Sequence, residues 1–269
     1  MPTVAVADTR LYYDDRGRGA PVLLIHGTGG SIATLAAVAQ RLSETNRVIS
    51  YDRRGFGRSS EAPAPKAEDY MRRQIDDAAT LLRELGAPGA SVFGWSMGGV
   101  VALGLASRHP NVVSRVVVYE PPIHAKKHMT VSLARALGGA VMLSKVGRYE
   151  RAAQRFFRFA LAYNTGGNAF DELDEPSRKL LLASARSVMA EVDAGTGEEI
   201  SRDEIGRIRC PVGIVVGTRS AKFLAAAAER LAEYLPRART LRMPAGDHVM
   251  NLRKPDVLTD AIRDLMNDA

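Results

Sequence analysis

The chain has 269 residues and contains a single cysteine, Cys210, which excludes an internal disulfide. It also lacks any uninterrupted apolar run long enough to span a bilayer, and its start, Met1-Pro2-Thr3-Val4, lacks the charged and then apolar pattern of a signal peptide. We therefore expect a soluble, cytoplasmic protein. The length fits one large α/β domain with an insertion, and it is sufficient to bury a substantial core.

Acidic residues are fewer than basic ones: 30 Asp and Glu against 37 Lys and Arg give a formal net charge of +7. Basic chains can bind nucleic acid, anionic membranes or acidic substrates. Here the arginines are spread along the whole chain, and no nucleic-acid motif accompanies them. We therefore expect a small-molecule substrate and neither a nucleic-acid nor a membrane partner. The sequence does not indicate an oligomeric state.

One group of arginines does recur at helical spacing, namely Arg148, Arg151, Arg155 and Arg158. This spacing places the four side chains on one face of a helix and leaves the apolar residues between them to point elsewhere. The first interpretation is a solvated helix face. The alternative is a contact for an anionic substrate or carrier.

Apolar strands and amphipathic helices alternate along much of the chain. Two short antiparallel strands are expected within residues 3 to 14, and further strands at 21–25, 47–52, 91–93, 112–119, 210–217 and 238–243. Helices are expected at 33–43, 69–85, 97–108 and 221–235, and from about 255. This alternation predicts an α/β fold with a mostly parallel, doubly wound sheet.

The alternation stops between residues 123 and 204, where the sequence is helical and basic and contains no strand of the preceding kind. We interpret this stretch as a helical cap inserted over the sheet. The predicted organisation is therefore a core formed by residues 1–121 and 205–269, with a cap formed by residues 122–204.

The most informative stretch is Gly94-Trp95-Ser96-Met97-Gly98, a Gly-x-Ser-x-Gly frame between an apolar strand and a helix of small residues. Without Cβ atoms, the two glycines let strand and helix approach closely while the serine adopts a strained backbone conformation. That conformation would hold the Ser96 hydroxyl out of the sheet and expose it to substrate. The pattern therefore indicates a nucleophile elbow.

Four motifs together resemble the α/β-hydrolase fold family. They are the elbow, His26-Gly27-Thr28-Gly29-Gly30, the stretch from Tyr51 to Ser59, and Gly246-Asp247-His248 followed by Pro255. The resemblance implies that Ser96 is the nucleophile, that His248 is its general base, and that the N–H groups of Thr28 and Met97 form the oxyanion hole. It implies neither a metal nor an organic cofactor. Weaker candidates for the base are His109, His124 and His128.

The acid that orients the histidine departs from the common family pattern. Many members carry an aspartate in a turn that here reads Gly217-Thr218-Arg219-Ser220, without a carboxylate. Glu120 is the best substitute, because it stands at the carboxyl end of the strand after the elbow, where catalytic groups collect in open α/β sheets. The alternatives are that Glu120 is structural, or that no acid remains. Asp247 is too close in sequence to His248, and Asp52 is more typical of a structural turn.

These features predict a serine hydrolase that cleaves an ester, a lactone or a related acyl bond through an acyl-enzyme, similar to carboxylesterases. The same constellation also serves carbon–carbon-bond hydrolysis and cofactor-free perhydrolase chemistry. A catalytically impaired ligand-binding protein is the alternative of a different class. Trp95 and Phe56 are expected to line the substrate pocket together with parts of the cap.

Overall fold

The computed structural model describes residues 2–59, 69–124, 131–195 and 200–267. Its centre is an eight-stranded sheet with strand order β1-β2-β4-β3-β5-β6-β7-β8. The strands are β1 Thr3–Val6, β2 Thr9–Arg16, β3 Pro21–Ile25, β4 Arg47–Tyr51, β5 Ala90–Trp95, β6 Val113–Tyr119, β7 Val212–Gly217 and β8 Arg239–Met243. From β4 to β8 neighbouring strands run parallel, whereas β1 and β2 add an antiparallel edge. The predicted fold class is confirmed.

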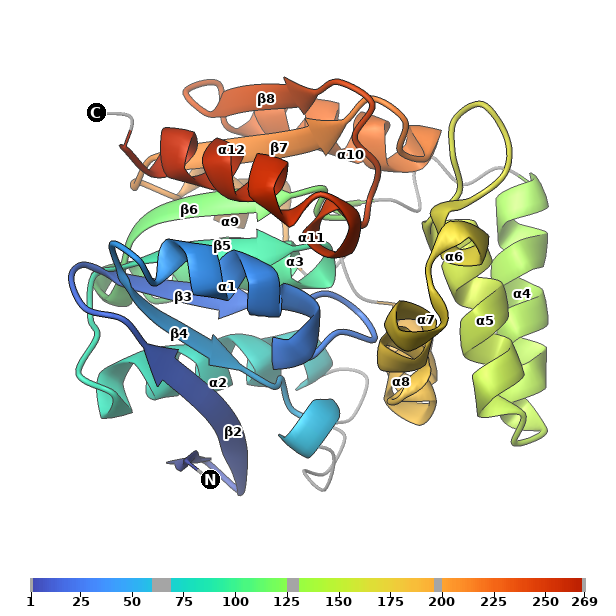
Figure 1. Cartoon of the computed structure of the whole chain (residues 1–269), viewed down its shortest axis with the longest axis horizontal. Coiled ribbons are helices and arrows are strands. Elements are labelled where there is room, and N and C mark those ends of the chain that lie inside the picture. The colour runs from blue at the N-terminus through green and yellow to red at the C-terminus, as the bar shows by residue number, and fades with distance from the viewer. Residues whose placement is uncertain (1, 60–68, 125–130, 196–199, 268–269) are drawn as a thin grey trace.

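Strands β3 and β7 are apolar throughout, because helices cover both faces of the sheet (Figure 1). In β3, for example, Leu23 and Ile25 belong to one buried cluster, while Val22 and Leu24 belong to the other. The order of the strands reverses around β3, which lies between β4 and β5. Ligands bind at the carboxyl ends of strands beside such a reversal, so the topology already selects the edge of the sheet where Ser96 emerges.

The helices of the core form two layers (Figure 1). One buried cluster joins the sheet to α2, α3, α9 and α10, and the other joins it to α1, α11 and α12. Their bounds are α1 Ala36–Leu42, α2 Tyr70–Glu84, α3 Met97–Arg108, α9 Arg202–Gly206, α10 Lys222–Tyr234, α11 Met250–Arg253 and α12 Pro255–Asn267. Short 3-10 helices occupy Ile32–Leu35, Gly57–Ser59 and Pro110–Val112. None of the helices in the described ranges is long and apolar enough to cross a membrane.

The elements described between β6 and β7 are helical, and Figure 1 shows α4 to α8 beyond the carboxyl ends of the parallel strands. They are α4 Val131–Lys145, α5 Tyr149–Ala160, α6 Ala169–Glu172, α7 Glu175–Leu182 and α8 Ala185–Asp193. We keep the name cap for this stretch, whose division from the core remains an interpretation. A fully buried ion pair, Arg53 Nη1 to Glu191 Oε1 at 2.7 Å, ties α8 to the loop after β4.

Candidate active site

Ser96 occupies the tight turn between β5 and α3. Its φ and ψ angles are 53° and −120°, outside the conformations that L-residues adopt without strain. The turn is possible because the flanking residues lack Cβ atoms: a Cβ on Gly94 would lie 2.3 Å from the Gly98 carbonyl oxygen, and one on Gly98 would lie 2.2 Å from that of Ile25. The sequence frame thus produces the strained elbow that it predicts.

His248 lies in the loop between β8 and α11 and is 5% exposed. Its Nε2 atom lies 2.9 Å from Ser96 Oγ. The main chain of the loop is held at this point, because Trp95 Nε1–H donates a hydrogen bond of 2.8 Å to the carbonyl oxygen of His248. Trp95, which directly precedes Ser96, therefore helps to position His248.

Glu120 follows β6, is fully buried, and has a positive φ of 47°. Its Oε2 atom lies 2.5 Å from His248 Nδ1, and its Oε1 atom accepts the Gly217 N–H at 2.7 Å. The turn after β7 that lacks a carboxylate thus contributes a backbone donor to the carboxylate from β6. With a hydrogen bond to each oxygen, the glutamate is fixed on the far side of the imidazole from Ser96.

The N–H groups of Thr28 and Met97 are the expected oxyanion donors. We find no hydrogen-bond acceptor for either group in the part of the chain that the structure describes. The loop that carries Thr28 comes close to the elbow, since a Cβ on Gly27 would lie 2.9 Å from Ser96 Cβ. Both donors therefore stand free beside the serine, as an oxyanion hole requires. Their role in catalysis stays a prediction.

Two hydrogen bonds of the His26 ring hold the loop that carries Thr28 in place. Its Nδ1–H donates to the Gly27 carbonyl oxygen at 2.8 Å, and its Nε2 accepts the Arg53 N–H at 2.9 Å. Because Nε2 is an acceptor, the ring is neutral. Burial, and secondly the Arg53 charge, hold the pKa of His26 well below its ordinary value of 6.5, although the Gly27 carbonyl opposes this shift.

The low pKa of His26 predicts a pH-dependent stability. Below pH 6.5 the unfolded chain binds a proton at His26 that the folded chain does not. The contribution of His26 to the free energy of unfolding is therefore fully present above pH 6.5 and decreases below it. The loss is up to about 1.4 kcal/mol per pH unit. Urea unfolding of the wild type and of His26→Gln, compared on both sides of pH 6.5, measures it. Equal slopes for the two proteins would contradict this prediction.

The other carboxylates near the site have structural partners. Asp52 accepts the N–H groups of Ile32 at 2.7 Å and of Arg58 at 2.8 Å, and burial raises its pKa. It is the turn residue that the sequence suggested. Asp247 binds Arg253 at 2.8 Å, whereas the acceptor for the ring of His248 is Glu120.

The weaker candidates for the base lie in other bonding arrangements. His109 Nε2 lies 3.0 Å from Asp76 Oδ1, and His124 contacts the Tyr234 hydroxyl and the Ile200 carbonyl oxygen. His128 falls outside the described residues. Of the described histidines, the structure places His248 at hydrogen-bond distance from Ser96.

A small cavity of about 20 Å³ lies over Ser96 and His248. Its remaining lining residues are Thr28, Trp95, Phe156, Phe157, Ala160, Leu161 and Leu181. Trp95 lines it as expected, but Phe56 does not. The Phe56 ring is fully buried, with the Arg53 guanidinium 4.7 Å from its centroid, and supports the loop after β4 instead.

The cap contributes the lining residues that the sequence did not identify individually. Four of them lie on α5 or directly after it, and Leu181 comes from α7. The available signal was the amphipathic pattern of α5, whose arginines leave one aromatic and apolar face to point inward.

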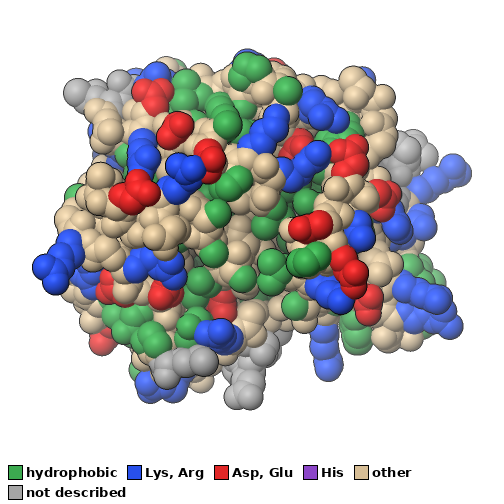
Figure 2. Space-filling view, in the orientation of Figure 1, with side chains coloured by type: hydrophobic (Ala, Val, Ile, Leu, Met, Phe, Trp, Pro, Cys, Tyr) green, Lys and Arg blue, Asp and Glu red, His purple; other side chains and the backbone are tan. Residues whose placement is uncertain are grey.

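The four arginines at helical spacing are exposed, on the side of α5 opposite to the residues that line the cavity. Figure 2 shows Lys and Arg side chains along the outer edge of the molecule, where α4 and α5 lie, with acidic side chains interspersed on this face. The arginines therefore do not surround a small substrate at Ser96. A contact between these arginines and a larger anionic carrier stays a prediction.

The described residues contain no group of three or more His, Cys, Asp or Glu side chains that could hold a metal ion.

Comparison with known proteins identifies the family of this chain. Residues 22–261 match the model of the "Alpha/beta hydrolase family". The chain is 31% identical over 245 residues to the pimeloyl-[acyl-carrier protein] methyl ester esterase of Chromobacterium violaceum, covering 88% of this chain and 91% of that protein. It is 24% identical to the mouse serine hydrolase BPHL, covering 98% and 85%.

Among solved structures, a thermophilic esterase from Thermogutta terrifontis has a TM-score of 0.78 at 23% identity, covering 99% of this chain and 98% of that one. At this level of identity the structural likeness supports the fold, while the family model and the curated relatives extend over most of the sequence. The chain therefore belongs to the alpha/beta hydrolase family of enzymes.

Proposed function

We propose that this protein is a serine hydrolase that cleaves uncharged esters or lactones through an acyl-enzyme on Ser96. The observation that carries this proposal is the continuous hydrogen-bonded chain from Glu120 through His248 to Ser96, with distances of 2.5 Å and 2.9 Å. This chain has the order and geometry needed to activate a hydroxyl for attack on an acyl carbon.

In the first half of the reaction, Ser96 Oγ attacks the carbonyl carbon while its proton moves to His248 Nε2. The Glu120 carboxylate keeps its hydrogen bond to His248 Nδ1–H and stabilises the imidazolium that forms. The N–H groups of Thr28 and Met97 donate to the tetrahedral oxyanion. When the intermediate collapses, His248 returns the proton to the departing alkoxide, and an alcohol leaves.

In the second half, water attacks the acyl carbon and gives a proton to His248 Nε2. The second tetrahedral intermediate collapses, the Ser96–acyl bond breaks, and His248 returns the proton to Ser96 Oγ. The products are a carboxylic acid and the free enzyme.

The lining of the cavity favours uncharged acyl groups. Apart from Ser96, His248 and Thr28, its residues are apolar, and none carries a formal charge. A carboxylate buried there would lose its hydration without gaining a cationic partner, which costs several kcal/mol.

The proposal predicts a burst of nitrophenol on mixing with p-nitrophenyl butyrate, followed by slower turnover, and an acylated Ser96 peptide after acid quench. p-Nitrophenyl crotonate and the mono-p-nitrophenyl ester of fumaric acid form a matched pair with the same chain length, and the trans double bond keeps the terminal carboxylate of the second from attacking its own ester. We expect kcat/KM for the fumarate ester to be lower by about 100-fold or more, because its charge must be buried. Equal rates for the two esters would contradict the uncharged substrate class.

The same experiment separates the alternatives. A ligand-binding protein without turnover would release no nitrophenol beyond the uncatalysed rate. That interpretation depended on the missing carboxylate after β7, and the position of Glu120 now weighs against it. No observation on the described residues favours carbon–carbon-bond hydrolysis or perhydrolase chemistry over ester cleavage.

A further inference from the structure

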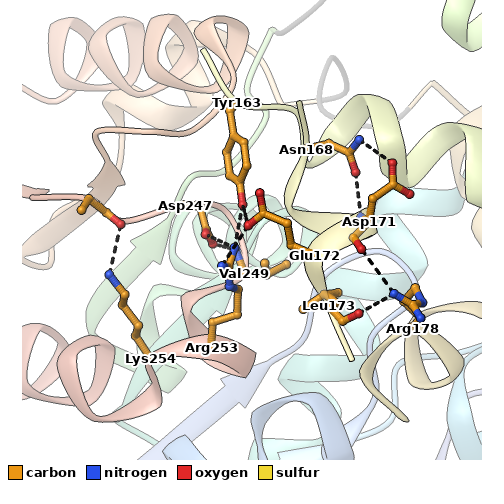
Figure 3. Close-up of polar contacts among 11 residues, drawn as sticks. Tyr163, Asn168, Asp171, Glu172, Leu173, Arg178, Asp247, Val249, Arg253 and Lys254 are labelled. Carbon is orange, nitrogen blue, oxygen red and sulfur yellow. Dashed lines mark hydrogen bonds and ion pairs between the residues drawn. The ribbon is translucent and has the colours of Figure 1, made fainter. Parts of the chain in front are cut away.

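The guanidinium of Arg253, the last residue of α11, joins the core to the cap (Figure 3). Its Nη1 donates to Asp247 Oδ2 at 2.8 Å and to the Tyr163 hydroxyl oxygen at 2.6 Å, and its Nη2 donates to Glu172 Oε2 at 3.1 Å. The Tyr163 hydroxyl in turn donates to Glu172 Oε2 at 2.7 Å. Asp247 belongs to the core, whereas Tyr163 and Glu172 belong to the cap.

Asp247 connects this cluster to the loop that carries His248. Its Oδ2 binds Arg253, while its Oδ1 accepts the Val249 N–H at 3.0 Å. The Asp247 side chain therefore bridges His248, from the residue before it to the N–H of the residue after it, and its second oxygen binds Arg253. Trp95 Nε1–H, next to the elbow serine, donates to the carbonyl oxygen of His248. The histidine backbone is thus bonded to the elbow and, through Asp247, to the Arg253 cluster.

The cap end of the cluster also contacts the turn after β7. The Arg219 guanidinium lies 4.2 Å from the centroid of the Tyr163 ring, and Asn164 donates its N–H to the Arg219 carbonyl oxygen at 3.1 Å. Asn164 Nδ2 donates to the Thr218 carbonyl oxygen at 2.8 Å. This is the turn whose first residue, Gly217, donates to Glu120. The same cap segment therefore supports the loops that hold both the base and its acid.

This cap segment also adjoins the cavity. Leu161, which lines the cavity, is two residues from Tyr163, and its carbonyl oxygen accepts the Ala169 N–H at 2.8 Å. A substrate that displaces the end of α5 would therefore act on the turn that holds Tyr163. The Arg253 cluster lies between that turn and the catalytic loop.

We propose that Arg253 is a positioning residue for His248, and that Tyr163 and Glu172 of the cap complete its binding site, so that the imidazole is aligned only while the cap is seated. This inference rests on the proposed function, because it takes His248 as the base. The physical reason is that proton transfer tolerates little misplacement, and a shift of about 1 Å can cost about 100-fold in rate. Without its cap partners, Arg253 can leave Asp247 and release the loop.

Arg263 provides a matched control for Arg253. Both arginine side chains are 30% exposed, and both bind a glutamate at 3.1 Å, Glu172 for Arg253 and Glu44 for Arg263. Arg263 also donates to the Arg41 carbonyl oxygen and so ties α12 to α1, away from the His248 loop. Replacing either arginine by methionine removes an arginine–glutamate contact between two elements, and only Arg253→Met also removes the partner of the Asp247 carboxylate.

We expect Arg253→Met to lower kcat for p-nitrophenyl butyrate by about 10- to 100-fold with less than about a twofold change in KM. Arg263→Met is expected to leave kcat unchanged, and the Tm of each variant measures its structural cost separately. Equal kcat values for the two variants would overturn the proposal, because a purely structural contact predicts that result.

Two further variants test whether Arg253 transmits the effect of the cap. Tyr163→Phe and Asp247→Asn remove contacts on opposite sides of Arg253. If the cluster acts as one unit, the fold-loss in kcat of the double variant is smaller than the product of the two single losses. Losses that multiply would show that the cap and the loop act independently and would overturn the coupling.

A readout that does not need turnover separates this proposal from the proposed function. The His248 Nδ1–H, in a short hydrogen bond to a carboxylate, gives a downfield proton resonance that Glu120→Gln identifies by removing it. We expect Arg263→Met to retain the resonance and Arg253→Met to broaden or lose it. An unchanged resonance in Arg253→Met would overturn the positioning role, whereas absence of Ser96-dependent turnover in the wild type would overturn only the proposed function.

Discussion

Ser96→Ala is expected to lower kcat for an alkyl ester by about 10⁵- to 10⁶-fold and to abolish the nitrophenol burst. The variant removes the atom that would form the acyl-enzyme and leaves His248 without the hydroxyl at 2.9 Å. The residual rate would come from the oxyanion donors and from binding alone. The measurement is steady-state hydrolysis together with mass analysis of the peptide that contains residue 96.

Ser50→Ala is the matched control for this loss. Ser50 lies in β4, and its buried hydroxyl has no hydrogen-bond partner among the described residues. Its removal should leave both kcat and the burst unchanged. If Ser96→Ala retained more than a few per cent of the wild-type rate, water activated directly by His248 would be the better mechanism, and the acyl-enzyme would be rejected.

Glu120→Gln is expected to lower kcat by about 10⁴-fold, with little change in KM. Both oxygens of Glu120 accept hydrogen bonds, one from Gly217 N–H and one from His248 Nδ1. A glutamine NH2 group at the Oε1 position would face the Gly217 N–H, which is another donor. At the Oε2 position it would donate to His248 Nδ1 and force the proton of the imidazole onto Nε2, which could then no longer accept the Ser96 proton.

Asp247→Asn distinguishes the orienting acid from a neighbouring carboxylate. Asparagine keeps the oxygen that accepts the Val249 N–H and removes only the bond from Arg253, because its NH2 group cannot accept. We therefore expect a loss of about tenfold, far smaller than that of Glu120→Gln. Pre-steady-state and steady-state rates of both variants, with the same ester, provide the comparison. Similar small losses in both variants would remove Glu120 from the proposed triad.

Several features of the fold and the site could be predicted from local sequence. The apolar runs of β3 and β7 reveal strands buried on both faces, because a parallel sheet with helices on each side leaves no polar face at its centre. The glycines on either side of Ser96 reveal the elbow, because the close approaches at these positions admit no Cβ atom. Both signals lie within a few residues of the structure they specify.

The role of Glu120 could be predicted from the sequence only in part. Its place at the end of β6 made it a candidate, but its contact with His248 depends on how the loops after β6 and β8 meet across β7. The positive φ of Glu120 turns the chain at this point, and the Gly217 N–H fixes the carboxylate. Such contacts join residues far apart in the chain, so local spacing could nominate the residue but could not establish the distance.

The order of strands and helices along the chain, the strained turn at Ser96 and the residues that could act there were predictable from local sequence, because they depend on short-range sterics and hydrophobic periodicity. The contact of Glu120 with His248, the cap residues that line the cavity and the contacts of Arg253 with the cap and with Asp247 emerged only from the folded structure. These outcomes depend on packing between residues far apart in the chain, such as Glu120 and His248, which are separated by 128 positions, and no local pattern encodes them.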